Sequence, residues 1–127
     1  MARKIMIASF IATAVGNSTI AQAAAEEIPC TLEARASVTV TVLDAEGAPV
    51  SDAVVRYSVR DEPARDCESF TDGEYVCGWE TSGHFFITAT RGAEAATAAL
   101  FVWWGGCHVR SERVTLRLSE MPADRSP

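Results

Sequence analysis

The sequence has few of the residues and motifs on which catalysis and nucleic-acid binding depend. It contains two histidines, and its 127 residues include no Gly-x-Ser-x-Gly elbow, no glycine-rich phosphate loop and no Cys-x-x-Cys pair. Eleven Lys and Arg residues stand against 17 Asp and Glu residues, giving a net charge of −6. Nucleic acids and anionic membranes are bound by clusters of basic side chains, so this balance argues against both as partners.

Long apolar runs are also scarce, and the clearest one lies near the N-terminus. Residues 5–15 are predominantly apolar and follow two basic residues. This pattern is typical of an export signal and is too short to cross a bilayer, which needs ~18–20 residues. The sequence therefore predicts a signal peptide over residues 1–23, cleaved after Ala23 or Ala25, and no membrane span in the rest. Removing 1–23 leaves nine basic and 17 acidic residues, a net charge of −8.

All four cysteines lie beyond this segment, and an even number in an exported chain predicts two disulfides. Their spacing does not match a zinc site, and three pairings are possible. Residues 67–77 have the pattern of a hairpin whose loop needs a positive φ at Gly73. Folding this segment about its midpoint places Cys67 opposite Cys77, which leaves Cys30 to pair with Cys107. We favour these two pairings and expect both disulfides to be structural.

Apolar side chains recur at every second position along most of the remaining chain, which indicates strands. The predicted strands cover residues 37–42, 53–59, 74–79, 85–90, 95–102 and 114–118, with a turn over 44–49. In the third of these, the alternation predicts that Tyr75, Cys77 and Trp79 share a face. The alanines of 95–100 leave a helix as the alternative for that segment. Six or seven short strands separated by turns predict an all-β sandwich.

Several segments in this order resemble carboxypeptidase regulatory-like domains. The resemblance covers residues 36–119 and is carried by segments 40–55, 71–75, 83–89 and 114–118. The first of these is similar to the opening strand and Gly-Pro turn of that family. The second resembles its Thr-Asp-x-Gly-aromatic turn, shortened here by one residue. The four cysteines and the segments Tyr75–Trp79 and Cys107–Val109 resemble a subgroup of small exported bacterial proteins with this domain.

The resemblance implies a seven-stranded prealbumin-like sandwich, antiparallel or mixed, over residues 36–119. An N-terminal extension over 24–35 and a disordered tail over 120–127 would flank it. The resemblance implies no catalytic residues. The related hydroxyisourate hydrolases end in Tyr-Arg-Gly-Ser, a motif that residues 121–127 lack.

The two histidines are the first candidates for a metal or acid–base site. Such a site would need His84 or His108 to converge with a carboxylate, for example Glu80 or Glu112. The alternative is that His84 is a solvated strand residue, since it alternates with the apolar positions of its strand, and that His108 simply adjoins a disulfide.

Calcium would need a dense set of oxygen ligands. Asp44, Glu46 and Asp72 offer carboxylates, but they lack the spacing of a calcium loop, and turns use Asp for their own backbone hydrogen bonds. We therefore expect no metal, no cofactor and no catalytic residue.

Two adjacent tryptophans, Trp103 and Trp104, precede a Gly-Gly pair. Neighbouring residues on a strand point to opposite faces, so at most one of the two rings can enter the core. Either one ring caps the open end of the sandwich, or the pair is exposed for contact with a partner or a sugar. Phe86, at an outward position of its strand, would extend the same patch. Phe86, Trp103 and Trp104 thus form the candidate contact surface.

The leading functional hypothesis is a non-catalytic secreted or periplasmic module that binds an unidentified protein or polysaccharide of the cell envelope. One alternative is a glycan-binding domain that uses Trp103 and Trp104. Another is a small envelope hydrolase or hydrolase inhibitor. An enzyme would need a pocket that combines His84 or His108 with a carboxylate.

Overall fold

The computed structural model describes residues 30–122, and all of its strands lie in the compact unit Leu32–Pro127. In chain order the strands are β1 (Ala36–Leu43), β2 (Val54–Val59), β3 (Arg65–Asp66), β4 (Glu68–Ser69), β5 (Glu74–Trp79), β6 (Gly83–Arg91), β7 (Glu94–Val102), β8 (Glu112–Arg117) and β9 (Ser119–Glu120). The described residues contain no helix, and hence none that could cross a membrane. The predicted signal peptide, residues 24–29 and residues 123–127 lie outside the described part.

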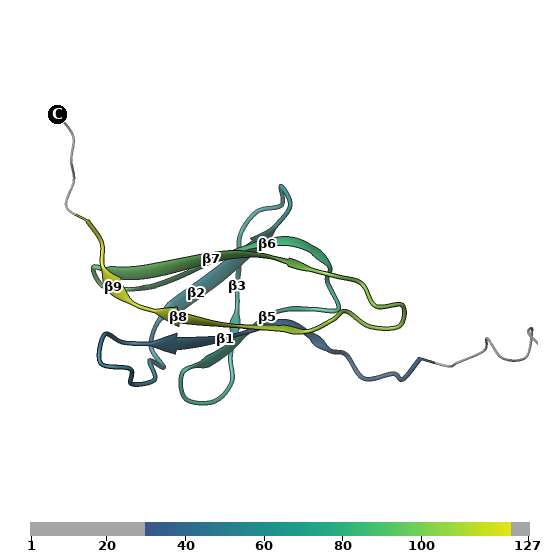
Figure 1. The fold of residues 1–127 in the computed structure, drawn as a ribbon, viewed down its shortest axis with the longest axis horizontal. Helices are drawn as coiled ribbons and strands as arrows, with labels where there is room; N and C mark the ends of the chain where they lie inside the picture. Colours follow the sequence, from purple (N-terminus) through teal and green to yellow (C-terminus); the bar gives the residue numbers. More distant parts are fainter. Residues whose placement is uncertain (1–29, 123–127) are drawn as a thin grey trace, which may run out of the picture. The chain divides into compact units, whose positions relative to one another are not determined.

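The strands form two sheets, as expected for an all-β sandwich. One sheet has the order β4-β5-β1-β8 and the other β3-β2-β6-β7-β9. Among the described strands, pairing is antiparallel except between β1 and β8, which run parallel, so the architecture is mixed. Figure 1 shows the sheets as two layers, with β6 and β7 over β1, β5 and β8.

Within residues 30–122 nine strands form where seven were predicted, because two segments change sheets and are each divided in two. β3 pairs with β2 and β4 pairs with β5, so the chain passes from one sheet to the other at Cys67. β8 pairs with β1 and β9 pairs with β7, so the second crossing is at Leu118. Strands that switch sheets form the corners of a sandwich. β9 also includes residue 120, which was expected to begin the tail.

The core lies between the layers and follows the predicted alternation. Inward positions of β1, β2, β5, β6 and β8 form one apolar cluster that includes Val38, Val40, Val42, Val55, Val59, Phe85, Ile87 and Leu116. Full burial of each such side chain contributes roughly 1.5–3 kcal/mol. The alanine-rich segment is strand β7, which pairs with β6 along its whole length. Alanine's helix propensity is overridden here by sheet pairing.

The hairpin around Gly73 forms as predicted. Glu68 and Ser69 pair with Val76 and Tyr75, and this register brings Cys67 to Cys77, which are joined by a disulfide. Gly73 has a φ of +74°, and a Cβ there would lie 2.6 Å from the Cβ of a proline. Cys30 and Cys107 are also disulfide-bonded, and no free cysteine is found in residues 30–122.

The prediction that Trp79 shares the inward face of β5 is wrong. Tyr75 and Cys77 are buried, but Trp79 is 39% exposed, and its Nε1 donates to Glu68 Oε1 at 3.4 Å. The alternation breaks at Gly78, whose φ is +84°. Any other residue at this position would have a strained backbone, and its Cβ would lie 3.2 Å from the Phe85 ring.

Candidate functional site

The two tryptophans lie where β7 leaves the sheet and enters a hairpin. Val102 ends β7 and is fully buried. Beyond it, Arg110 N donates to Trp103 O at 2.8 Å, and Trp104 forms a bridge with Val109. Gly105 N then donates to His108 O at 2.8 Å and closes the turn. Residues 103–110 therefore form a two-stranded extension of the sandwich, which we call the tryptophan hairpin.

Both tryptophans are exposed, Trp103 by 59% and Trp104 by 52%. The interpretation that one ring caps the end of the core does not hold, because Val102 and Val109 are the buried residues at this end. The sequence alone could not decide this. The strand predicted over residues 95–102 ends where β7 ends, but the sequence does not show how the rings that follow are packed. The alternative, an exposed aromatic pair, is the one that forms.

A continuous row of rings leads from the tryptophan hairpin onto the outer face of β6 and β7. The Trp103 ring packs on Phe101 with 4.3 Å between centroids, and Phe101 packs on His84 at 4.7 Å. His84 and Phe101 are also direct partners across the two strands. Phe86 lies two residues further along β6, on the same face, and is 51% exposed. The structure thus places the three predicted contact residues on one side of the molecule.

Beside this row is a hollow of about 390 Å³, which we call the tryptophan hollow. Phe101, Trp103 and Trp104 form its apolar wall, and Arg60, Ser82 and His84 supply its polar groups. No carboxylate of the described chain lines it, although the protein is acidic overall. Phe86 lies outside this hollow and borders a separate, smaller one of about 160 Å³.

Arg60 was not among the predicted site residues, and hydrogen bonds to main-chain carbonyls of the neighbouring segment hold it in place. Arg60 directly follows β2 and has a positive φ of 57°. Its backbone N donates to His84 O at 3.0 Å, and its guanidinium donates to Ser82 O at 2.9 Å. The sequence shows only that Arg60 follows a predicted strand and begins a polar turn. It does not show that Arg60 would contact β6 and the residue before it.

His108 does meet Glu80, one of the two carboxylates considered for it. His108 Nδ1 is hydrogen-bonded to Glu80 Oε2, and both side chains are mostly buried. Glu80 also accepts the backbone N–H of Val109 at 3.0 Å and that of Arg35 at 3.1 Å. The carboxylate therefore anchors the tryptophan hairpin to the segment that precedes β1.

Burial raises the pKa of Glu80, but the hydrogen bonds from His108, Val109 and Arg35 more than offset it and hold the pKa below its ordinary value. The carboxylate is thus kept in the acceptor form that the hairpin needs. All of these contacts are made within the fold, and they fix the position of the tryptophan hairpin.

The remaining candidate groups do not converge. His84 is exposed and packs on Phe101, as in the solvated-strand interpretation. Asp44 Oδ1 accepts the backbone N–H groups of Glu46 and Ala48 at 2.9 and 2.8 Å, which is the role expected of a turn aspartate. Within residues 30–122, no group of three or more His, Cys, Asp or Glu side chains is placed to hold a metal ion.

Comparisons of this chain with models of protein families, with curated proteins and with solved structures gave no match.

Proposed function

We propose that the chain is a non-catalytic binding module of the secreted or periplasmic compartment and that it holds a glycan in the tryptophan hollow. Two disulfides support an oxidising compartment, since such bonds persist outside the cytosol. The mixed two-sheet architecture supports the finer proposal of a prealbumin-like, carboxypeptidase regulatory-like domain.

The observation that carries the proposal is the pair of exposed indoles beside a concave surface. Trp103 and Trp104 are each more than half exposed and line a hollow of about 390 Å³. Tryptophan combines a large apolar ring with a polar N–H, so it can stack on the C–H face of a sugar and still donate a hydrogen bond. A hollow with an apolar wall and a few polar groups is the usual form of a small-ligand site.

The polar groups of the hollow suit hydroxyl-rich ligands. Arg60 uses one of its five N–H donors on Ser82 O, which leaves others for a ligand. His84 is held by its edge contact with Phe101. Sugar hydroxyls can accept from the guanidinium and either donate to or accept from the imidazole.

The site is also built in advance of binding. The turn bond at Gly105 and the Glu80 carboxylate both restrain the tryptophan hairpin. A loop that is already ordered loses little conformational entropy when a ligand binds, which favours affinity.

Protein recognition by the same face is the second candidate. One observation favours it: Phe86 is 51% exposed and extends the aromatic row beyond the hollow. A saccharide confined to the hollow would leave Phe86 uncovered, whereas a protein partner would cover it.

Fluorescence titration with neutral, N-acetylated and uronic-acid oligosaccharides tests the proposal. We expect at least one class to change the tryptophan emission and Trp103→Ala or Trp104→Ala to weaken its binding at least tenfold. Stacking and hydrogen bonds of this kind contribute about 1–3 kcal/mol. Trp79→Ala, on the other sheet, is the matched control and should bind normally.

No response to any class, or equal binding by all three variants, would contradict the glycan proposal. Phe86 lies outside the tryptophan hollow, so Phe86→Ala should bind the oligosaccharide as tightly as the parent.

A further inference from the structure

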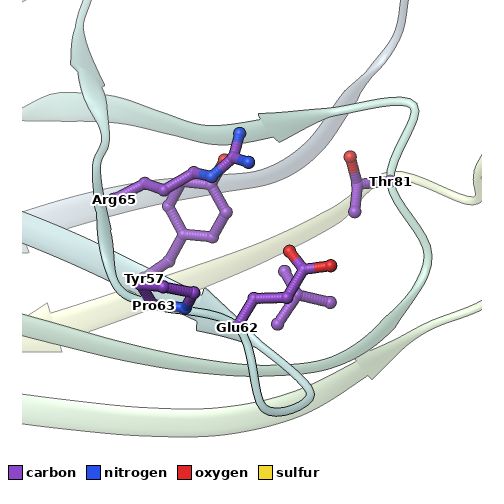
Figure 2. Close-up of a pocket in the computed structure, with 6 residues that line it drawn as sticks. Tyr57, Glu62, Pro63, Arg65 and Thr81 are labelled. Carbon is purple, nitrogen blue, oxygen red and sulfur yellow. The ribbon is translucent and has the colours of Figure 1, made fainter.

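A second hollow, of about 210 Å³, is separate from the tryptophan hollow and shares no lining residue with it. It lies where the end of β2, the loop that follows it and the start of β3 approach the segment after β5. Tyr57, Val59, Glu62, Pro63, Arg65 and Thr81 line it (Figure 2). We call it the Tyr57 pocket.

Tyr57 is buried without a partner for its hydroxyl. The side chain is 9% exposed and its ring stacks on Phe85 with 5.5 Å between centroids. The hydroxyl has no hydrogen bond within residues 30–122. Tyr75, the other buried tyrosine, donates its hydroxyl to Val50 O at 2.8 Å and accepts Ala53 N at 3.2 Å. Buried polar groups are nearly always hydrogen-bonded, so the exception at Tyr57 calls for a partner that enters the pocket.

Arg65 places a cation beside this hydroxyl. Tyr57 and Arg65 are direct partners between β2 and β3, so their side chains are neighbours on one face. Figure 2 shows the Arg65 guanidinium at the hydroxyl end of the Tyr57 ring. Neighbouring Arg56 is bound by Asp66 Oδ1 at 3.0 Å and Ala64 O at 3.2 Å. Arg65, by contrast, forms no ion pair or hydrogen bond through its side chain in the described residues.

Acceptors lie across the pocket. Figure 2 shows the Glu62 carboxylate pointing into the pocket between Tyr57 and Thr81. Glu62 has no ion-pair partner among residues 30–122, and in particular does not pair with Arg65. The Thr81 hydroxyl donates its proton to Trp79 O at 2.9 Å, so its oxygen keeps a lone pair for a ligand donor.

We propose that the Tyr57 pocket binds a small amino acid through its α-ammonium and α-carboxylate groups. Arg65 and the Tyr57 hydroxyl donate to the carboxylate, while Glu62 and Thr81 accept from the ammonium group. A simple anion would engage only the donor side, and an uncharged ligand would engage neither of the two charges, which are exposed to water without a ligand.

The size of the pocket agrees with this ligand class. A hollow of about 210 Å³ is below the ~300–1,000 Å³ typical of sites for drug-sized molecules. It corresponds to roughly seven waters at ~30 Å³ each, which leaves room for a ligand of few heavy atoms. Val59 and Pro63 provide the apolar contact for a short side chain.

Calorimetric titration of the oxidised full chain with alanine, N-acetyl-alanine and alanine methyl ester tests the proposal. Charge-assisted hydrogen bonds of this kind correspond to about 10–100-fold in affinity. We expect alanine to bind and each blocked derivative to bind at least tenfold more weakly. Tyr57→Phe, Arg65→Gln and Glu62→Gln should each weaken alanine binding by a similar factor, and Arg56→Gln should leave it unchanged.

Tyr57→Phe removes only the hydroxyl, so its thermal midpoint should equal that of the parent and show that the loss of binding is local. Three results would overturn the proposal: no binding of alanine at ~10 mM, binding of N-acetyl-alanine as tight as that of alanine, or a fall in thermal midpoint for Tyr57→Phe as large as that for Tyr75→Phe.

Discussion

Tyr75→Phe is expected to destabilise the sandwich far more than Tyr57→Phe, although each removes one phenol oxygen from the core. The Tyr75 hydroxyl is bonded to Val50 O at 2.8 Å and Ala53 N at 3.2 Å, and both partners are main-chain groups in or beside the core. Leaving a buried polar group unsatisfied costs about 1–3 kcal/mol, so the two together imply a loss of about 2–6 kcal/mol. The Tyr57 hydroxyl has no such partner in residues 30–122, and its removal should change stability by less than about 0.5 kcal/mol.

Guanidinium and thermal unfolding of the oxidised variants measure this difference. Domains of this size have a total stability of about 5–15 kcal/mol, so Tyr75→Phe removes a large part of it. Its thermal midpoint should fall by at least about 8 °C, since 1 kcal/mol corresponds to roughly 4–8 °C. The denaturant dependence should not change, because the fold buries the same surface. Equal losses in the two variants would refute the hydrogen-bond assignment of both tyrosines.

Two further predictions concern the glycine turns and the Glu80 carboxylate that anchors the tryptophan hairpin. Gly73→Ala should lower the free energy of unfolding by more than the ~1–2 kcal/mol of a left-handed alanine, because its Cβ would lie 2.6 Å from the Cβ of Pro49. Gly92→Ala, with a φ of +60° and open space around it, should cost only the backbone strain. Equal unfolding free energies for the two variants would contradict this. The pKa of Glu80 is lowered by folding, so the stability it contributes is complete above its ordinary pKa of 4.5 and is lost as the pH falls through its folded-state pKa. Glu80→Gln should therefore flatten the acid side of a stability–pH curve, while the exposed Glu120→Gln should leave the shape of the curve unchanged. An unchanged curve for Glu80→Gln would contradict the anchoring role of the Glu80 carboxylate.

Local pattern was enough to predict most of the strands and the first disulfide. Val38, Val40 and Val42 alternate because one face of β1 is buried, and this rule needs no tertiary information. The pairing of Cys67 with Cys77 follows from the midpoint of a short hairpin, which fixes the register locally.

The predictions failed where a single backbone angle or a distant contact decides the outcome. The positive φ of Gly78 breaks the alternation before Trp79, and no period-two pattern shows such an angle. The exposure of both tryptophans depends on the hairpin that follows β7, and the predicted end of that strand at residue 102 does not show this hairpin. Arg60 reaches the tryptophan hollow through bonds to Ser82 and His84, more than twenty residues away in the sequence.

The most direct test of the proposed function uses the indole N–H signals of the three tryptophans in a ¹⁵N NMR titration of the oxidised protein with the oligosaccharide class that alters the emission. We expect the signals of Trp103 and Trp104 to shift together and saturate, while that of Trp79 stays in place. A shift of Trp79 alone, or no shift of Trp103 and Trp104 at saturating oligosaccharide, would contradict it.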